Sequence, residues 1–276
     1  MKSKIYLKII KNLKKPHLIP EKIFFKLKVF FNFIFYEINY DAEKFKEKQS
    51  KIFNEISLDY KSGINFFDNL KNKYEFLKPD NELPHSEHSI FFSSLSLKYQ
   101  DKFKNILEIG TYNGKNAFLL SQLFAKCKIY TLDLPDNDQI FSSSYKRDTT
   151  DLKNLFIKRR NEILNKSKNI EMVKKNSVHL MYFKNKFDLI WVDGAHYCPI
   201  VCFDILNSLK LINTEGFILC DDISLINYNA TIESLKILKA EKIIDYKLIY
   251  KNVDARKNAH PKRRSYIAVV TKVNKL

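Results

Sequence analysis

The turn EIGTYNG, residues 108–114, has the residue types of a nucleotide-binding loop, because two glycines lie in a short polar stretch after an apolar run. A phosphate loop for ATP needs four residues between its glycines and a hydroxyl after its lysine. Here three residues separate the glycines, and Lys115 is followed by Asn116. A dinucleotide loop needs a glycine where this chain has Tyr112. The turn therefore predicts neither ATP hydrolysis nor dinucleotide binding.

An acid at the start of this turn points to a different ligand. The Glu108 carboxylate would repel a phosphate and would suit a cation, or a ligand with an ammonium group and hydroxyls. S-adenosylmethionine carries both a sulfonium and an α-ammonium. A second acid, Asp133, ends the next apolar run and is placed to accept two hydrogen bonds from a ribose diol. The alternative for Glu108 alone is an ordinary strand-end carboxylate, but the two acids together favour this cofactor.

Three further acids and a histidine follow two later apolar runs. Asp193 and His196 stand in D-G-A-H, and Asp221 and Asp222 form the pair in LCDDI. Adjacent parallel strands lie about 4.8 Å apart, so carboxylates at neighbouring strand ends crowd together unless a cation balances them. Carboxylate oxygens suit Mg²⁺, and less specifically Mn²⁺ or Ca²⁺. Without a metal, Asp193 could orient the cofactor amine, Asp222 could cap a helix, and His196 could cap a helix or bind a carbonyl.

Apolar runs and helical patterns alternate from residue 105 onward. This alternation predicts a doubly wound, mostly parallel, Rossmann-like α/β sheet of seven strands in a domain spanning residues 84–276. No helical pattern separates the last two runs, which indicates an antiparallel hairpin at the C-terminal end. The strand-like runs are expected near 105–109, 128–134, 169–177, 187–194, 216–222, 245–252 and 263–272.

Residues 1–83 are predicted to form a basic, helical N-terminal extension. VFFNFIFY, residues 29–36, is too short to cross a bilayer, which needs about 20 apolar residues, and it lacks the features of a signal peptide. It could lie on an anionic membrane surface, or pack as an accessory helix on the main domain or on a second subunit. We therefore expect a cytoplasmic protein, either free or peripheral at the inner membrane face, and the alternative of a homo-oligomer stays open.

Charge and cysteine content limit the possible binding partners and the redox state of the cellular compartment. The net charge of +17 favours anionic partners such as nucleic acid, a phosphorylated substrate or an anionic membrane, although a solvated lysine-rich surface gives the same count. The four cysteines form no C-x-x-C pair, so reduced, buried thiols are expected. The spacing of His196, Cys198 and Cys202 matches no standard zinc site.

One connection is longer than a βα loop usually is. The polar stretch NDQIFSSSYKRDTT, residues 137–150, exceeds the usual two to six residues. It could form a lid over the acceptor, in which Lys146 and Arg147 meet an anionic substrate. The alternative is a disordered surface loop.

Taken together, these motifs resemble the class I S-adenosylmethionine-dependent methyltransferases over roughly residues 84–272. EIGTYNG is similar to motif I of the O-methyltransferases, including the catechol type. The resemblance implies that Asp133 binds the ribose and that Asn176 and Ser177 lie near the adenine. It places the remaining cofactor contacts at Glu108, Gly110, Thr111, Tyr112, Asn113, Gly114 and Asp193.

The later motif, D-G-x-H followed by D-D, resembles the metal-dependent O-methyltransferases of macrolide sugars and the cephalosporin-hydroxylase-like group. In these relatives the aspartate of D-x-x-H and the later acidic pair hold Mg²⁺, and the histidine of the sugar enzymes is the general base. The resemblance therefore implies Asp193, Asp221 and Asp222 as metal ligands and His196 as the catalytic base.

The sequence thus predicts an S-adenosylmethionine-dependent O-methyltransferase, assisted by Mg²⁺, that acts on a hydroxyl of a sugar, a glycan or another small acceptor. A divalent cation would lower the pKa of the alcohol, and an imidazole could take its proton. Two alternatives remain. One is methylation of RNA or another anionic polymer, which the lack of an N-P-P-Y type motif disfavours. The other is a non-catalytic cofactor-binding scaffold.

Overall fold

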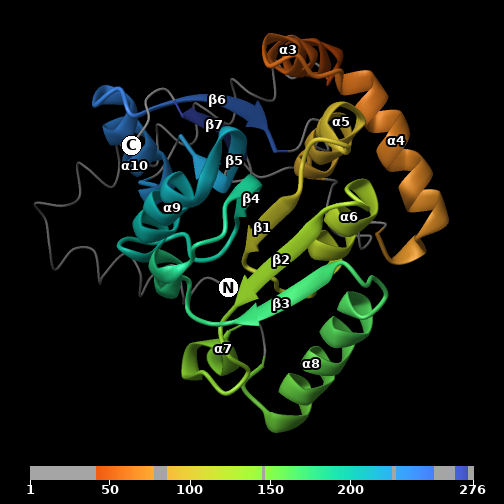
Figure 1. The fold of residues 1–276 in the computed structure, drawn as a ribbon, viewed down its shortest axis with the longest axis vertical. Helices are drawn as coiled ribbons and strands as arrows, with labels where there is room; N and C mark the ends of the chain where they lie inside the picture. Colours follow the sequence, from red (N-terminus) through yellow and green to blue (C-terminus); the bar gives the residue numbers. More distant parts are fainter. Residues whose placement is uncertain (1–41, 78–85, 145–146, 226–227, 252–264, 273–276) are drawn as a thin grey trace, which may run out of the picture.

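The computed structural model describes residues 42–77, 86–144, 147–225, 228–251 and 265–272, and these form one seven-stranded sheet with helices around it (Figure 1). The strand order is β3-β2-β1-β4-β5-β7-β6. The strands are β1 (Asn105–Ile109), β2 (Lys128–Asp133), β3 (Ile170–Lys174), β4 (Phe187–Val192), β5 (Ile212–Ser224), β6 (Ile244–Tyr250) and β7 (Ser265–Lys272). Residues 29–36, the aromatic stretch of the N-terminal region, lie outside the described residues.

The pairing of the strands confirms the predicted fold class. Strands β1 to β5 pair in parallel, whereas β7 runs antiparallel to both β5 and β6. The chain starts in the middle of the sheet, builds outward to β3, and then returns to the other side of β1 with β4. The carboxyl ends of β1 and β4 therefore form a switch point, which is where open α/β sheets bind ligands.

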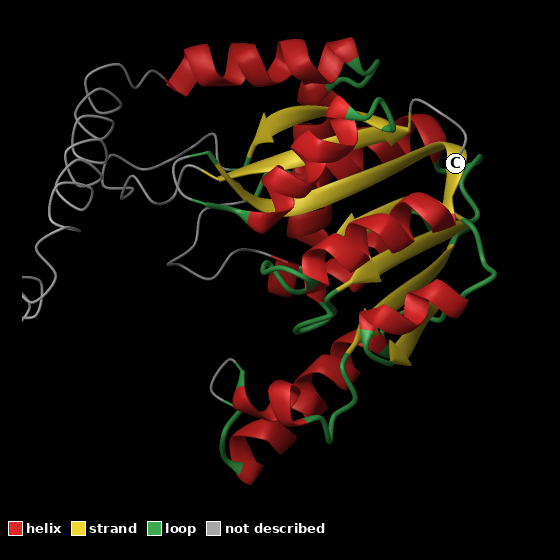
Figure 2. Cartoon of the chain, turned by 90° about the vertical axis from the view of Figure 1, so that its left-hand side faces the viewer, coloured by secondary structure: helices red, strands yellow, loops and turns green. Residues whose placement is uncertain are grey.

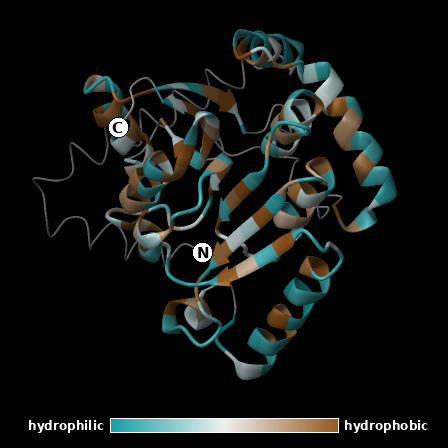
Figure 3. Cartoon of the chain, in the orientation of Figure 1, coloured by the Kyte–Doolittle hydropathy of each residue, from teal (hydrophilic) through white to brown (hydrophobic). Residues whose placement is uncertain are grey.

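Helices cover both faces of the sheet, as Figures 1 and 2 show from two directions. One core cluster joins α5 (His88–Tyr99) and α6 (Lys115–Leu123) to one face. The other joins α9 (Ile200–Leu211) and α10 (Ala230–Ala240) to the opposite face. Hydrophobic residues gather on the strands, while hydrophilic residues predominate on α3 (Ala42–Glu55) and α8 (Thr150–Leu164), as Figure 3 shows. The alternation read from the sequence thus sorts the side chains between two cores.

The helices before the sheet are bonded to α5 and to the β6 edge of the sheet. Helix α4 (Tyr60–Lys73) begins at Asp59, whose carboxylate accepts from the Ser62 amide at 2.9 Å. The Ser94 hydroxyl of α5 donates to the Asp59 carbonyl at 2.7 Å. At the sheet edge, the Gln49 amide of α3 (Ala42–Glu55) exchanges two hydrogen bonds with the Tyr250 backbone of β6, at 3.1 and 3.0 Å. These helices share a core with the sheet, and a domain boundary at residue 83 stays a prediction.

The described part of the predicted lid is folded. Helix α7 (Gln139–Ser143) begins at Asp138, which accepts from the Ile140 amide at 2.7 Å. Its Phe141 is buried, and the Arg147 guanidinium lies over the Phe141 ring at 3.9 Å and the Phe156 ring at 4.6 Å. Phe156 belongs to α8 (Thr150–Leu164). These stacking contacts hold Arg147 inward, whereas Lys146, the other predicted substrate contact, lies outside the described residues.

The cysteines only partly follow the expected burial. Cys127 and Cys220 are buried, but Cys198 is exposed and Cys202 is half-buried, and all four are free thiols. Cys198 precedes Pro199 in the loop that leads into α9, outside both cores. None of the helices in the described ranges is long and apolar enough to cross a membrane.

Candidate functional site

A cavity of about 390 Å³ opens at the carboxyl ends of the parallel strands. It is bounded by the turn after β1, the end of β2, the α7 region and the segments after β3 and β4. Five of the predicted cofactor residues outside the D-G-A-H motif line it, namely Gly110, Tyr112, Asp133, Asn176 and Ser177. Asp193 and His196 line it as well, so the cavity brings the two sequence motifs together.

The turn after β1 depends on glycine at its first position. Gly110 has a φ of 103°, and a Cβ there would lie 2.2 Å from the Asp193 carbonyl oxygen. The Asp193 amide also donates to the Ile109 carbonyl at 2.9 Å, so the ends of β1 and β4 touch at this point. Gly114, with a φ of 78°, is the residue from which α6 starts. Glycine thus permits the backbone to pass directly beneath the cavity.

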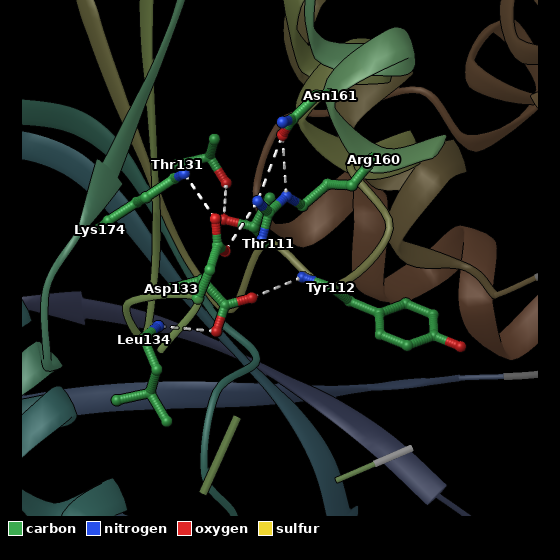
Figure 4. A network of polar contacts seen from close by, with 9 residues as sticks. Thr111, Tyr112, Thr131, Asp133, Leu134, Arg160, Asn161 and Lys174 are labelled. Carbon is green, nitrogen blue, oxygen red and sulfur yellow. Dashed lines mark hydrogen bonds and ion pairs between the residues drawn. The ribbon is translucent and has the colours of Figure 1, made fainter. Parts of the chain in front are cut away.

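Asp133 is held in place by the turn that it faces (Figure 4). Its Oδ2 accepts from the Tyr112 amide at 3.1 Å, and its Oδ1 accepts from the Leu134 amide at 2.8 Å. Burial raises the pKa of this carboxyl, and the two amide hydrogen bonds partly offset that effect. A fixed carboxylate at the end of β2 fits the predicted role of a ribose acceptor.

Glu108 is placed differently from the other predicted cofactor residues. It does not line the cavity, because its side chain is buried beneath α6. Its Oε1 accepts from the Asn116 amide at 2.8 Å, and its Oε2 accepts from the Thr131 hydroxyl, which also contacts the Thr111 hydroxyl. Burial raises the pKa of Glu108 to about 7, against the effect of these hydrogen bonds. Thr111, Asn113 and Gly114 also lie outside the cavity lining.

An acid that the sequence reading passed over also lines the cavity. Asp204 is fully buried on α9, and its Oδ2 lies 3.5 Å from where a Cβ on Gly194 would be. Burial raises its pKa to about 6, and the Ser177 hydroxyl partly offsets this effect. The signal was present in the sequence, because PIVCFDIL places one acid within an otherwise apolar helix.

The second motif forms one cluster beside the cavity. His196 Nε2 lies 3.5 Å from Asp193 Oδ1 and 3.7 Å from Asp222 Oδ2. Burial raises the pKa of Asp193 well above its ordinary value, and the neighbouring Asp221 charge adds to the effect. Asp221 is buried, whereas Asp222 is partly exposed. The structure therefore brings together the four residues that the sequence grouped.

A local irregularity in β5 places both Asp221 and Asp222 in the same cluster. Consecutive residues of a regular strand point to opposite faces of a sheet. The register with β7 shifts between Cys220 and Ile223, and Asp222 has a φ of 52°. This left-handed residue re-aims the second side chain, as bulges commonly do next to functional sites.

The cation in this cluster is a lysine. Lys251 Nζ contacts Asp221 Oδ2 at 2.6 Å and also hydrogen-bonds to Asp222 Oδ1. Its side chain is 17% exposed. Lys251 lies within the strand-like run predicted at 245–252, and no role was predicted for it, because nothing nearby in the sequence marks it as the partner of two distant acids.

The arrangement does not fit the predicted Mg²⁺ site. An ammonium group is bonded to two of the three expected ligands. Within the described residues, no group of three or more His, Cys, Asp or Glu side chains could hold a metal ion. The carboxylates are of the right chemical type, but their oxygens face an internal cation.

The strand order and the cavity at the carboxyl ends of the strands agree with the resemblance to the class I S-adenosylmethionine-dependent methyltransferases. The glycine at which the backbone passes beneath the cavity and the fixed acid at the end of β2 fit a nucleoside cofactor without phosphates. Residues 107–223 match the family model described as a methyltransferase domain, which confirms the predicted enzyme class. No curated protein matches the chain.

Solved structures similar to this chain include three methyltransferases. The tomaymycin-synthesis O-methyltransferase TomG of Streptomyces achromogenes is 14% identical, with 85% of this chain and 100% of that chain covered and a TM-score of 0.47. A precorrin-6y C5,15-methyltransferase of Geobacter metallireducens is 14% identical, covers 72% and 96%, and scores 0.48. The Podospora anserina methyltransferase PaMTH1 is 17% identical, covers 77% and 88%, and scores 0.43.

Proposed function

We propose that this chain transfers a methyl group from S-adenosylmethionine to a hydroxyl of a sugar, a glycan or another small hydroxylated acceptor. The observation that carries the proposal is the position of His196. Its imidazole lines the cofactor cavity and has a carboxylate oxygen of Asp193 on one side and one of Asp222 on the other. A base at this place can serve an acceptor that lies beside the methyl donor.

The residues around the cavity would align the methyl donor with the acceptor hydroxyl. S-adenosylmethionine, when bound, provides an electrophilic methyl group on a cationic sulfur. The close approach at Gly110 leaves room for the ligand along the backbone turn, and Asp133 is held ready for the ribose hydroxyls. Asn176 and Ser177, which line the cavity after β3, fit the adenine end. Fixing the two reactants in line is the largest contribution expected in such a transfer.

His196 would accept the hydroxyl proton of the acceptor through its imidazole. Nε2 lies 3.5 Å from Asp193 Oδ1 and 3.7 Å from Asp222 Oδ2, so these two side chains orient the imidazole at the cavity. General base catalysis of this kind contributes about 10²- to 10⁴-fold in rate. Methyl transfer neutralises the sulfonium, so the reaction needs no acid for a leaving group.

The Mg²⁺ that the resemblance implied has no step in this proposal. Two of its three expected ligands are bonded to the Lys251 ammonium, and a divalent ion at the same oxygens would have to displace it. The acceptor could also be an anionic polymer such as RNA, in line with the charge of +17. No described feature of the cavity selects a polymer, so the small acceptor is the better-supported choice.

The test is a screen of hydroxylated acceptors for release of S-adenosylhomocysteine, with RNA as a separate arm. The variants are His196→Ala and, as a matched control, His179→Ala, because His179 lies on η3 (Ser177–Tyr182) outside the cavity lining. We expect kcat of His196→Ala to fall about 10²- to 10⁴-fold while S-adenosylhomocysteine binding changes only a few-fold.

Two results would contradict the proposal. If His196→Ala keeps its kcat, the imidazole is not the base. If the chain binds the cofactor tightly but turns over none of the acceptors, the non-catalytic scaffold becomes the better interpretation.

A further inference from the structure

Both the backbone amide and the backbone carbonyl of Lys251 are hydrogen-bonded to other parts of the chain. Its amide donates to the Ser265 carbonyl of β7 at 3.0 Å, and its carbonyl accepts from the Glu87 amide at 2.8 Å. Glu87 itself is buried at the start of α5 and accepts from the Gln49 amide at 3.3 Å. Lys251 therefore follows β6 at a fixed point, and its side chain reaches past β7 to β5.

Its ammonium lies where the acids need a positive charge. Asp221 is 4% exposed and offers Oδ2 to Lys251 at 2.6 Å, and Asp222 Oδ1 is a second hydrogen-bond acceptor. The other oxygen of Asp222 faces His196. One carboxylate thus joins the ammonium to the imidazole, so the position of Lys251 bears directly on that of the base.

The titration of the cluster agrees with this geometry. Lys251 lowers the pKa of Asp222 against the effect of burial, and it also opposes the rise in the pKa of Asp193. Burial alone would lower the pKa of Lys251, but the Asp221 and Asp222 charges raise it. The lysine is therefore held charged by the acids that it neutralises.

We propose that Lys251 is the built-in cation of the Asp193–Asp221–Asp222 cluster, that it takes the place of a divalent metal ion, and that it positions His196 through Asp222. The inference rests on the proposed function in assigning His196 as the base. Lys251 is a positioning residue, because its ammonium bonds to Asp221 and Asp222 and its side chain is not among those that line the cavity.

Metal chemistry explains why the two cations exclude each other. Mg²⁺ requires oxygen ligands at about 2.0–2.1 Å in an octahedral arrangement, whereas the ammonium donates three hydrogen bonds at longer distances. A divalent ion that shared Asp221 Oδ2 with Lys251 would also lie beside a like charge. With Lys251 in place, no three of the described acid or histidine side chains are arranged to hold a metal ion. Removing the ammonium frees the carboxylates of Asp221 and Asp222 to turn toward one ion, and carboxylate oxygens are ligands that Mg²⁺ and Mn²⁺ prefer.

The experiment is a Mn²⁺ titration of the full chain followed by electron paramagnetic resonance, with S-adenosylhomocysteine present. The proteins compared are the wild type, Lys251→Met, Lys251→Arg and the control Lys236→Met. Lys236 is an exposed lysine of α10 that pairs with Glu233 and not with the acids of the cluster. We expect no stoichiometric Mn²⁺ site in the wild type, in Lys251→Arg or in the control, and one site per chain in Lys251→Met.

Two outcomes overturn the proposal. One Mn²⁺ bound per wild-type chain would show that the ammonium gives way to a metal. No Mn²⁺ site in either the wild type or a folded Lys251→Met variant would show that the acids do not form a cation site. If Lys251→Met does not fold, as judged by circular dichroism, Lys251→Gln replaces it, because its amide keeps hydrogen-bonding capacity without the charge.

Activity gives an independent readout once an acceptor is found. Wild-type turnover should be unchanged by EDTA, and Lys251→Gln should lose kcat with little change in cofactor affinity, with recovery in Lys251→Arg. Turnover that EDTA abolishes and Mg²⁺ restores would contradict the inference. The Mn²⁺ titration needs no acceptor, so it decides the role of Lys251 even if the proposed methyl transfer fails.

Discussion

Replacing Glu108 by glutamine should stabilise the protein at neutral and alkaline pH. Burial raises the pKa of this carboxyl from an ordinary 4.5 to about 7. Between these two pH values the folded chain holds a proton that the unfolded chain has released. Stability must therefore fall as the pH rises through this window, and above pH 7 the full cost of ionising the buried group is present.

The size of the effect follows from the two pKa values. Each pH unit of difference corresponds to about 1.4 kcal/mol, so the ionised Glu108 costs up to about 3 kcal/mol. A glutamine of the same shape carries no charge. Its oxygen can accept from Asn116, and its amide can donate to the Thr131 hydroxyl, so both neighbours keep a partner.

The assay is urea unfolding of the wild type and of Glu108→Gln at several pH values from 4.5 to 8.5. The free energy of unfolding of the variant, relative to the wild type, should rise with pH to a gain of about 2–3 kcal/mol above pH 7. Glu233→Gln, an exposed carboxylate on α10, is the control for loss of a surface charge. A difference that stays flat with pH, or a variant less stable at pH 8, would refute the reasoning.

The same variant tests the predicted contact between Glu108 and the cofactor. Because the side chain lies outside the cavity lining, we expect the affinity for S-adenosylhomocysteine to change only a few-fold. A loss of binding would instead show that the carboxylate reaches the cofactor, as its place in the motif implied.

Three further substitutions test the cavity and its supports. Gly110→Ala should cost about 1–3 kcal/mol of stability from its backbone conformation alone, plus the overlap with Asp193, and thermal unfolding should show it. Asp133→Asn should weaken S-adenosylhomocysteine binding about 10- to 100-fold in calorimetry, because hydrogen bonds to a charged group contribute about 1.5–3 kcal/mol. Arg160→Met should cost about 1–3 kcal/mol in urea unfolding, since the variant loses the charged hydrogen bond to Asp136 at 2.9 Å while Asp136 keeps its ion pair with Lys174. An unchanged melting temperature of Gly110→Ala, an unchanged affinity of Asp133→Asn or an unchanged unfolding midpoint of Arg160→Met would contradict the corresponding expectation.

The features that the sequence predicted are those fixed by neighbouring residues. Alternating apolar positions identified the strands, and the missing helix before β7 identified the antiparallel end of the sheet. The glycine turn was also readable, because Gly110 has a φ of 103° that other residues rarely adopt. Such signals are local, so a single chain displays them without any knowledge of its tertiary contacts.

Side-chain direction at the strand ends was less predictable. Glu108 follows Leu107 by one position, and period-two alternation turns it toward α6 and the core that contains Ile106. Asp221 and Asp222 should have pointed to opposite faces by the same rule. A register shift of β5 against β7 brings both to one cluster, and a shift of this kind leaves no clear mark in the sequence.

By itself, therefore, the sequence determined a doubly wound methyltransferase fold and a group of three acids and one histidine. Only the tertiary structure decided which cation those acids face. Lys251 follows Asp221 by 30 residues and reaches it across β7, the strand that pairs with both β5 and β6. Charge neutralisation acts through space between strands, whereas the patterns that a sequence displays reflect the periodicity of one strand or helix at a time.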